Sequence, residues 1–178
     1  HPTQALLDMF SIMEKKETLE GKKIVIVGDI SHSRVARSDI YGMTKMGADV
    51  HLAGPRTMVY PELEKLGVTV HHDVREAVEG ADVVNVLRIQ LERINAALYP
   101  TNREYARIFG INQDVLKLAK DDVMVLHPGP MNRGLEISSD VAYWDQSMIQ
   151  EQVRNGVSVR MAVLYLTIHG GDGSELAD

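Results

Sequence analysis

Basic side chains follow two predicted strands at points where they can bind a small anion. Arg34 lies in the first turn of a predicted helix, where its guanidinium and the helix N-terminus can bind a carboxylate together. Arg88 and Gln90 follow a later strand and point to one side of an extended chain. Ligands of an open parallel sheet bind outside the carboxyl ends of its strands, so these residues predict two carboxylate clamps.

Both clamps have a structural alternative. A lone arginine is more often a solvated residue on a helix face. Arg37 lies one turn after Arg34, so both could belong to one solvated face, and this alternative stays open. Near the second clamp, Glu92 is placed to orient Arg88, and Arg93 is placed to bridge to another domain. A charged loop without a role would have the same sequence.

Two further segments carry groups that suit a small polar ligand. The turn from His127 to Pro130 combines prolines, which fix the backbone, with a glycine that lets it approach a ligand closely. Such a turn offers main-chain carbonyls and amides, although it could also be purely structural. His1, Gln4 and Asp8 lie about one helical turn apart, so the imidazole and the amide can point at one polar group.

These segments belong to a regular alternation of strands and helices. Residues 88–111 interrupt it, and a connection of that length in a compact domain is usually functional. The alternation predicts an α/β fold, a doubly wound, Rossmann-like parallel sheet with helices on both faces, and residues 170–178 are expected to fray. The predicted strands are 22–29, 48–54, 68–70, 81–87 and 123–126, and the predicted helices are 1–18, 33–46, 61–66, 73–79, 112–120 and 146–169, with a break near Gly156 left open.

Composition narrows the class of protein. The 178 residues, 44% of them hydrophobic, suit a single domain, and a net charge of −6 argues against nucleic acid as a partner. The absence of cysteine excludes disulfides and thiolate metal sites, and no apolar run is long enough for a membrane span, so we expect a cytoplasmic protein. A nicotinamide cofactor is not expected, because the Gly-x-Gly-x-x-Gly spacing is missing after the first strand.

Taken together, the motifs resemble those of the carbamoyltransferases. Residues 1–8 resemble the signature that opens the linking helix of that family, and residues 28–34 resemble one of its substrate loops. The Arg88-x-Gln90-x-Glu92-Arg93 stretch resembles the aspartate-recognition segment of the aspartate members. The turn 127–130 also resembles the aspartate members, because ornithine members carry a cysteine there and this chain has none.

The resemblance implies transfer of the carbamoyl group of carbamoyl phosphate to the amine of L-aspartate, which gives N-carbamoyl-L-aspartate and phosphate for pyrimidine biosynthesis. His1 would polarise the carbonyl oxygen of carbamoyl phosphate. Gln4 and the main chain of Pro128, Gly129 and Pro130 would bind its amide end. The resemblance implies no metal and no cofactor.

It also implies the roles of the basic residues. Arg34 would bind one carboxylate of aspartate, and Arg88 with Gln90 would bind the other, while the choice of α-carboxylate stays open. Glu92 and Arg93 would support this clamp. Arg160 resembles a further family arginine near the site.

Finally, the resemblance implies that residues 1–178 form an aspartate-binding domain of a longer chain and that the complete protein is a homotrimer. The helices 1–19 and 146–169 would pack on an N-terminal domain that holds the phosphate-binding loop, so the fragment alone should be inactive and the loop 88–111 mobile. The alternatives are a non-catalytic amino-acid-binding or scaffolding module, an ornithine-type carbamoyltransferase, and a nucleotide-cofactor dehydrogenase.

Overall fold

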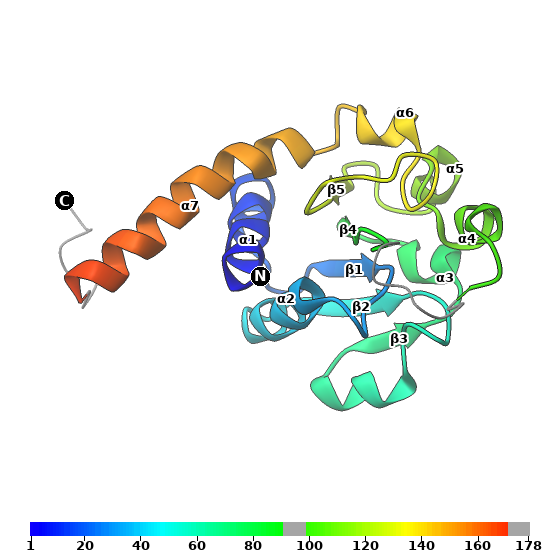
Figure 1. The fold of residues 1–178 in the computed structure, drawn as a ribbon, viewed down its shortest axis with the longest axis horizontal. Coiled ribbons are helices and arrows are strands. Elements are labelled where there is room, and N and C mark those ends of the chain that lie inside the picture. The colour runs from blue at the N-terminus through cyan, green and yellow to red at the C-terminus, as the bar shows by residue number, and fades with distance from the viewer. Residues whose placement is uncertain (91–98, 171–178) are drawn as a thin grey trace.

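The centre of the structure is one sheet of five parallel strands in the order β3-β2-β1-β4-β5 (Figure 1). The computed structural model describes residues 1–90 and 99–170. Each strand overlaps a segment predicted from the sequence. The strands are β1 (Lys23–Val27), β2 (Asp49–Ala53), β3 (Thr69–His71), β4 (Val83–Val86) and β5 (Met124–Leu126).

Helices cover both faces of this sheet. Helix α2 (Arg34–Lys45) packs on one face with α1 (Pro2–Lys16) beside it, while α3 (Val74–Val78) and α5 (Gln113–Leu116) lie on the other (Figure 1). Burial on both faces explains why β1 is β-branched from Ile24 to Val27 and why β4 is fully buried, with Asn85 as its one polar residue. The predicted doubly wound, Rossmann-like α/β fold is therefore confirmed.

The strand order shows where the ligand-binding edge of the sheet lies. The connections leave β1 toward β2 and β3 on one side, and β4 and β5 lie on the other side. The topological switch point therefore lies between β1 and β4, which pair directly. The segments that follow these two strands, beginning at Gly28 and Leu87, meet at this point, where open α/β sheets bind their ligands.

The middle of the chain agrees with one prediction and differs from another. Residues 61–66 form the predicted short helix, which is a 3-10 helix, η1 (Pro61–Leu66). The stretch 88–111, predicted as one long connection, contains helix α4 (Asn102–Phe109). Thr101 caps it by accepting a hydrogen bond from the backbone of Glu104, and Tyr105 and Phe109 bury one face. Residues 91–98 of the predicted loop lie outside the described residues.

The C-terminal elements also differ from expectation. Helix α5 ends at Leu116 rather than Lys120, and the short helix α6 (Ser139–Ala142) was not predicted. Helix α7 (Ile149–His169) is continuous through Gly156, packs against α1, and then extends away from the sheet (Figure 1). None of the helices in the described ranges is long and apolar enough to cross a membrane.

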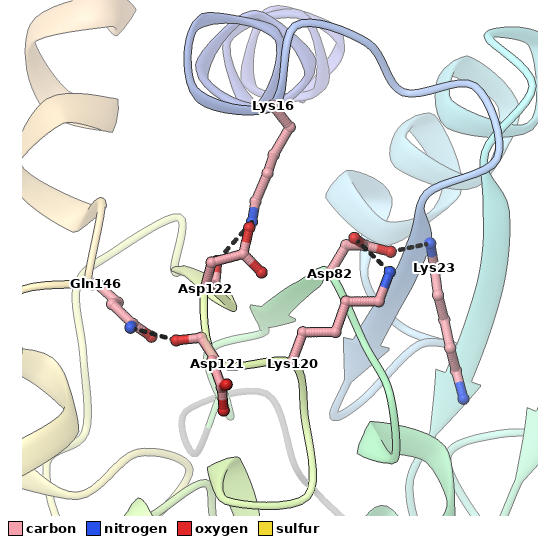
Figure 2. A network of polar contacts seen from close by, with 7 residues as sticks. All are labelled: Lys16, Lys23, Asp82, Lys120, Asp121, Asp122 and Gln146. Carbon is pink, nitrogen blue, oxygen red and sulfur yellow. Dashed lines mark hydrogen bonds and ion pairs between the residues drawn. The ribbon is translucent and has the colours of Figure 1, made fainter.

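Charged side chains fix the amino ends of the central strands, at the edge opposite the switch point (Figure 2). The Asp82 carboxylate accepts hydrogen bonds from the backbone N–H of Lys23 at 3.0 Å and from Nζ of Lys120 at 2.8 Å. Lys16 of α1 pairs with Asp122, just before β5, at 2.7 Å. Burial raises the pKa of Asp82, but the bonds from Lys120 and Lys23 outweigh it and hold that pKa below its usual range. This network joins β1, β4 and α1 away from the ligand edge.

Candidate functional site

A cleft of about 340 Å³ opens at the switch point of the sheet. Its walls come from the start of α1, the loop after β1, the segment after β4, the turn after β5, and α7. Seven residues predicted to bind substrate line it, together with Arg160, which was predicted to lie near the site: His1, Gln4, Arg34, Arg88, Gln90, Pro128 and Gly129. Pro130 is not among the lining residues, and Glu92 and Arg93 fall outside the described part of the chain.

The loop after β1 presents Arg34 to the cleft. Gly28 turns the chain at φ 132°, and a Cβ there would lie 3.0 Å from Cβ of Leu87, so only glycine lets the two strand ends approach this closely. Ser33 then caps α2 by accepting a hydrogen bond from the backbone N–H of Ala36 at 3.1 Å. Arg34 is therefore the first residue of the helix, where the positive helix end adds to its charge.

The start of α1 is attached to the same helix. Nδ1 of His1 lies 3.0 Å from Oγ of Ser38, one turn beyond Arg34 in α2. Gln4 donates from Nε2 to Oδ1 of Asp8 at 2.8 Å, one turn further along α1. Sequence reasoning grouped His1, Gln4 and Asp8 by spacing, but it missed Ser38, because a serine inside a helix carries no signal of its own.

The turn after β5 presents hydrogen-bond acceptors on a backbone that its prolines hold rigid. The Gly129–Pro130 bond is cis, and the backbone N–H of Gly129 donates to Nδ1 of His127 at 2.9 Å. Since Pro128 and Pro130 have no N–H, the turn can offer carbonyl oxygens but no free amide, which corrects the expectation that it would offer both. His127 is buried and is itself held by Glu136, with Nε2 and Oε1 3.2 Å apart.

Asn132 connects this turn to the segment that carries Arg88 and Gln90. Its Nδ2 donates to the backbone oxygen of Ile89 at 2.8 Å and to Oε2 of Glu136 at 3.1 Å. The buried Glu136 therefore supports both the proline turn and the second predicted clamp. The only sequence signal for Glu136 was a carboxylate between two apolar residues at 135 and 137.

Arg160 reaches the cleft from α7. Its Nη1 donates to the backbone oxygen of Gly156, one turn earlier, at 2.9 Å. A Cβ at position 156 would lie only 2.5 Å from the same Nη1. Gly156, which suggested a helix break, instead makes room for the guanidinium.

The cleft can bind a small anionic molecule through charge and hydrogen bonds. Its cationic side chains are Arg34, Arg88 and Arg160, in a chain whose net charge is −6. Imidazole, amide and carbonyl groups lie between them, which suits a ligand with two negative ends and a polar centre. No cluster of three or more metal-binding side chains occurs within residues 1–90 and 99–170.

A doubly wound sheet with a basic cleft at its switch point defines a substrate-binding domain of the α/β class. Residues 20–167 match the family model described as "Aspartate/ornithine carbamoyltransferase, Asp/Orn binding domain". The chain therefore belongs to the aspartate/ornithine carbamoyltransferase family.

Relatives of known name are similar over the whole chain. The aspartate carbamoyltransferase catalytic subunits of Ruminiclostridium cellulolyticum and Desulforamulus reducens are 61% and 60% identical over 178 residues, which is 100% of this chain and 57% of each relative. The chain thus spans little more than half the length of these curated relatives.

Solved structures agree with the fold. An ornithine carbamoyltransferase from Pyrococcus furiosus matches with a TM-score of 0.80 and 34% identity, over 93% of this chain and 56% of that one. An aspartate transcarbamoylase from Trypanosoma cruzi in complex with phosphate matches with a TM-score of 0.78 and 29% identity, over 93% and 56% of the two chains.

Proposed function

We propose that this chain is the aspartate-binding domain of an aspartate carbamoyltransferase, which converts carbamoyl phosphate and L-aspartate to N-carbamoyl-L-aspartate and phosphate. One observation carries the proposal: Arg34 and the Arg88–Gln90 pair line the same cleft as His1 and the proline turn. Two cationic clamps then flank the groups suited to a carbamoyl centre. The high identity to named aspartate carbamoyltransferase catalytic subunits adds support.

The carbamoyl group fits between α1 and the proline turn. When Nδ1 of His1 accepts the hydroxyl proton of Ser38, Nε2 carries the ring proton and can donate it to the carbonyl oxygen. The carbonyl oxygens of Pro128 and Gly129 can accept the N–H bonds of the carbamoyl amide, and Gln4 lies beside them. Both contacts fix the carbamoyl carbon for attack.

Aspartate supplies the nucleophile and explains the arginines. Its deprotonated amine attacks the carbamoyl carbon, an oxyanion forms, and phosphate leaves, so catalysis consists of positioning and charge stabilisation. Arg34 would bind one carboxylate, and Arg88 with Gln90 would bind the other. An ornithine side chain would bring its ammonium toward one of these guanidinium groups, and this repulsion favours aspartate as the acceptor.

The remaining part of the enzyme would contact α1 and α7. Both helices leave large apolar side chains exposed, which is unusual for a free surface. We assign residues 1–19 and 146–169 to contacts with an N-terminal domain that binds the phosphate group. The complete protein would be a cytoplasmic homotrimer, and the present chain alone would be inactive. The exposed residues are Leu6, Phe10 and Met13 of α1, and Val153, Val157, Met161, Leu164, Tyr165, Leu166 and Ile168 of α7.

Product analysis of the full-length protein tests this proposal. Incubation with carbamoyl phosphate and either L-aspartate or L-ornithine should give N-carbamoyl-L-aspartate and phosphate in the first case and little product in the second. Transfer to ornithine alone would indicate the ornithine-type enzyme. Binding of aspartate without release of phosphate would indicate a non-catalytic amino-acid-binding module.

A further inference from the structure

Two buried carboxyl groups lie beneath the cleft. Asp8 of α1 and Asp39 of α2 are both 0% exposed, and Asn85 of β4 beside them is also 0% exposed. Burial of a carboxylate is costly unless hydrogen bonds or a nearby cation compensate for it. The contacts of this cluster therefore need a physical explanation.

Asp8 connects the two sides of the carbamoyl part of the cleft. Its Oδ1 accepts hydrogen bonds from Nε2 of Gln4 and from Nε2 of Gln152 in α7, each at 2.8 Å. Gln152 in turn accepts, at Oε1, the backbone N–H of His127 at 2.9 Å. One carboxyl oxygen thus orients the Gln4 amide and, through Gln152, the strand end that leads into the proline turn.

Asp39 joins the same cluster to the aspartate side of the cleft. Asn85 donates from Nδ2 to Oδ2 of Asp39 at 3.2 Å, and Asn85 lies three residues before Arg88. Asp39 directly follows Ser38, the residue that contacts the ring of His1. The cluster therefore lies where α1, α2, β4 and α7 converge.

Among the residues that the structure describes, the groups that face this pair include no cation to neutralise two negative charges. Asp8 is faced by Asp39 from α2, Asn85 from β4 and Gln152 from α7, and Gln4 lies on its own helix. Three buried oxygens in the described cluster have no hydrogen-bond partner: Asp8 Oδ2, Asp39 Oδ1 and Asn85 Oδ1. A proton on one carboxyl group would turn an unpartnered acceptor into a donor and remove the repulsion between the two acids.

We propose that Asp8 and Asp39 hold a single proton between them at neutral pH and act together as positioning residues, with Oδ1 of Asp8 orienting the amides of Gln4 and Gln152. Neither group touches substrate. The directions of their pKa shifts agree with this: burial raises the pKa of Asp8 to about 6, and burial followed by the charge of Asp8 raises the pKa of Asp39 well above its usual value. The positioning role rests on the proposed function, whereas the shared proton does not.

Infrared spectroscopy of the full-length protein tests the shared proton. At neutral pH the wild type should show the carbonyl band of a protonated carboxylic acid, which Asp39→Asn should remove because Asp8 then ionises without a second carboxylate beside it. Asp114→Asn, at an exposed carboxylate paired with Lys117, is the matched control and should keep the band. A band that persists in Asp39→Asn, or is missing in the wild type, overturns the shared proton.

Steady-state kinetics of the same protein test the positioning role. Asp8→Ala removes the acceptor of Gln4 and should raise KM for carbamoyl phosphate about tenfold, with a smaller effect on kcat. Asp8→Asn keeps an oxygen acceptor and should recover most of the loss, which a purely structural defect would not predict. An unchanged KM for carbamoyl phosphate in Asp8→Ala overturns the positioning role. If Asp8→Ala does not fold, Asp8→Asn is compared with Gln4→Ala instead. An equal rise in KM in these two variants then overturns the role. A wild type without carbamoyl transfer would refute the proposed function and leave the infrared result standing.

Discussion

Nδ1 of His1 lies 3.0 Å from Oγ of Ser38, which joins the N-cap residue of α1 to the second turn of α2. The contact spans 37 residues of sequence. It holds the imidazole on the side of α2 from which Arg34 also reaches the cleft. Ser38 therefore orients the ring, and where its hydroxyl donates to Nδ1, the ring proton lies on Nε2.

Removal of the Ser38 hydroxyl should impair the full-length enzyme. In Ser38→Ala the ring of His1 loses its fixed partner, and kcat/KM for carbamoyl phosphate should fall about tenfold, as for loss of one hydrogen bond to a catalytic group. Ser38→Thr keeps the hydroxyl and should retain most of the activity. Equal kinetics in Ser38→Ala and the wild type would show that the contact does not orient the ring.

Substitution of the two clamp arginines should weaken the binding of aspartate, whereas substitution of a neighbouring surface arginine should not. Arg34→Ala and Arg88→Ala should each raise KM for aspartate in the full-length enzyme by roughly 100-fold, because each leaves a carboxylate without its charged partner. Arg37 is exposed and is not a cleft residue, so Arg37→Ala is the matched control and should behave as the wild type. The assignment fails if Arg37→Ala has the largest effect of the three.

Substitution of Gly156 by alanine should weaken substrate binding without destabilising helix α7. Alanine at this position favours the helix by about 1 kcal/mol, but its Cβ would displace the Arg160 guanidinium, the flexible end of a long side chain. Gly156→Ala should therefore raise a substrate KM severalfold in the full-length enzyme while thermal unfolding stays at or above the wild-type temperature. In an Arg160→Ala background the same change should add nothing, and a further rise in KM there would contradict this coupling.

The network at the amino edge of the sheet predicts a dependence of stability on acid. Because the folded protein holds the pKa of Asp82 below its unfolded value of about 3.9, its contribution is complete above that pH and is lost as the pH falls through the folded pKa. Urea unfolding of the 178-residue chain should show that Asp82→Asn lowers stability at neutral pH and much less in acid. Asp114→Asn, at an exposed ion pair, should change little at either pH. A loss in Asp82→Asn that is independent of pH would contradict the prediction.

The apolar face of α7 should contribute to stability and activity only in the complete protein. Val157 is 61% exposed, so Val157→Glu should leave unfolding of the present chain nearly unchanged. In the full-length protein the same charge would be buried against the N-terminal domain, and it should lower both activity and thermal stability. Equal thermal stability of mutant and wild type at full length would rule out α7 as a domain contact.

The sequence predicted the sheet well because its strands are short β-branched runs between glycines and polar residues. It failed at α4, where only Tyr105 and Phe109 are buried and the arginines at 103 and 107 suggested a loop. It grouped the cleft residues correctly because the strand ends of a parallel sheet converge.

The supporting side chains were harder to predict. Asp39, Asn85 and Gln152 are buried polar residues on elements far apart in the chain, and their contacts exist only after packing. The one available signal was Asp39, an acid on the same helix face as the buried Ala36, Ile40 and Met43. Glu92 and Arg93 stay predictions, because they lie outside the described residues.

The proline turn lacks any free N–H at Pro128, Gly129 and Pro130, and this has a consequence for molecules that imitate carbamoyl phosphate. Acetyl phosphate has nearly the same shape, but it carries a methyl group where carbamoyl phosphate, the proposed substrate, carries nitrogen. That methyl group would cover the carbonyl oxygens of Pro128 and Gly129 without satisfying them, and the desolvation would go uncompensated. The turn can thus reject an isosteric acyl donor by hydrogen bonding alone, with no steric clash.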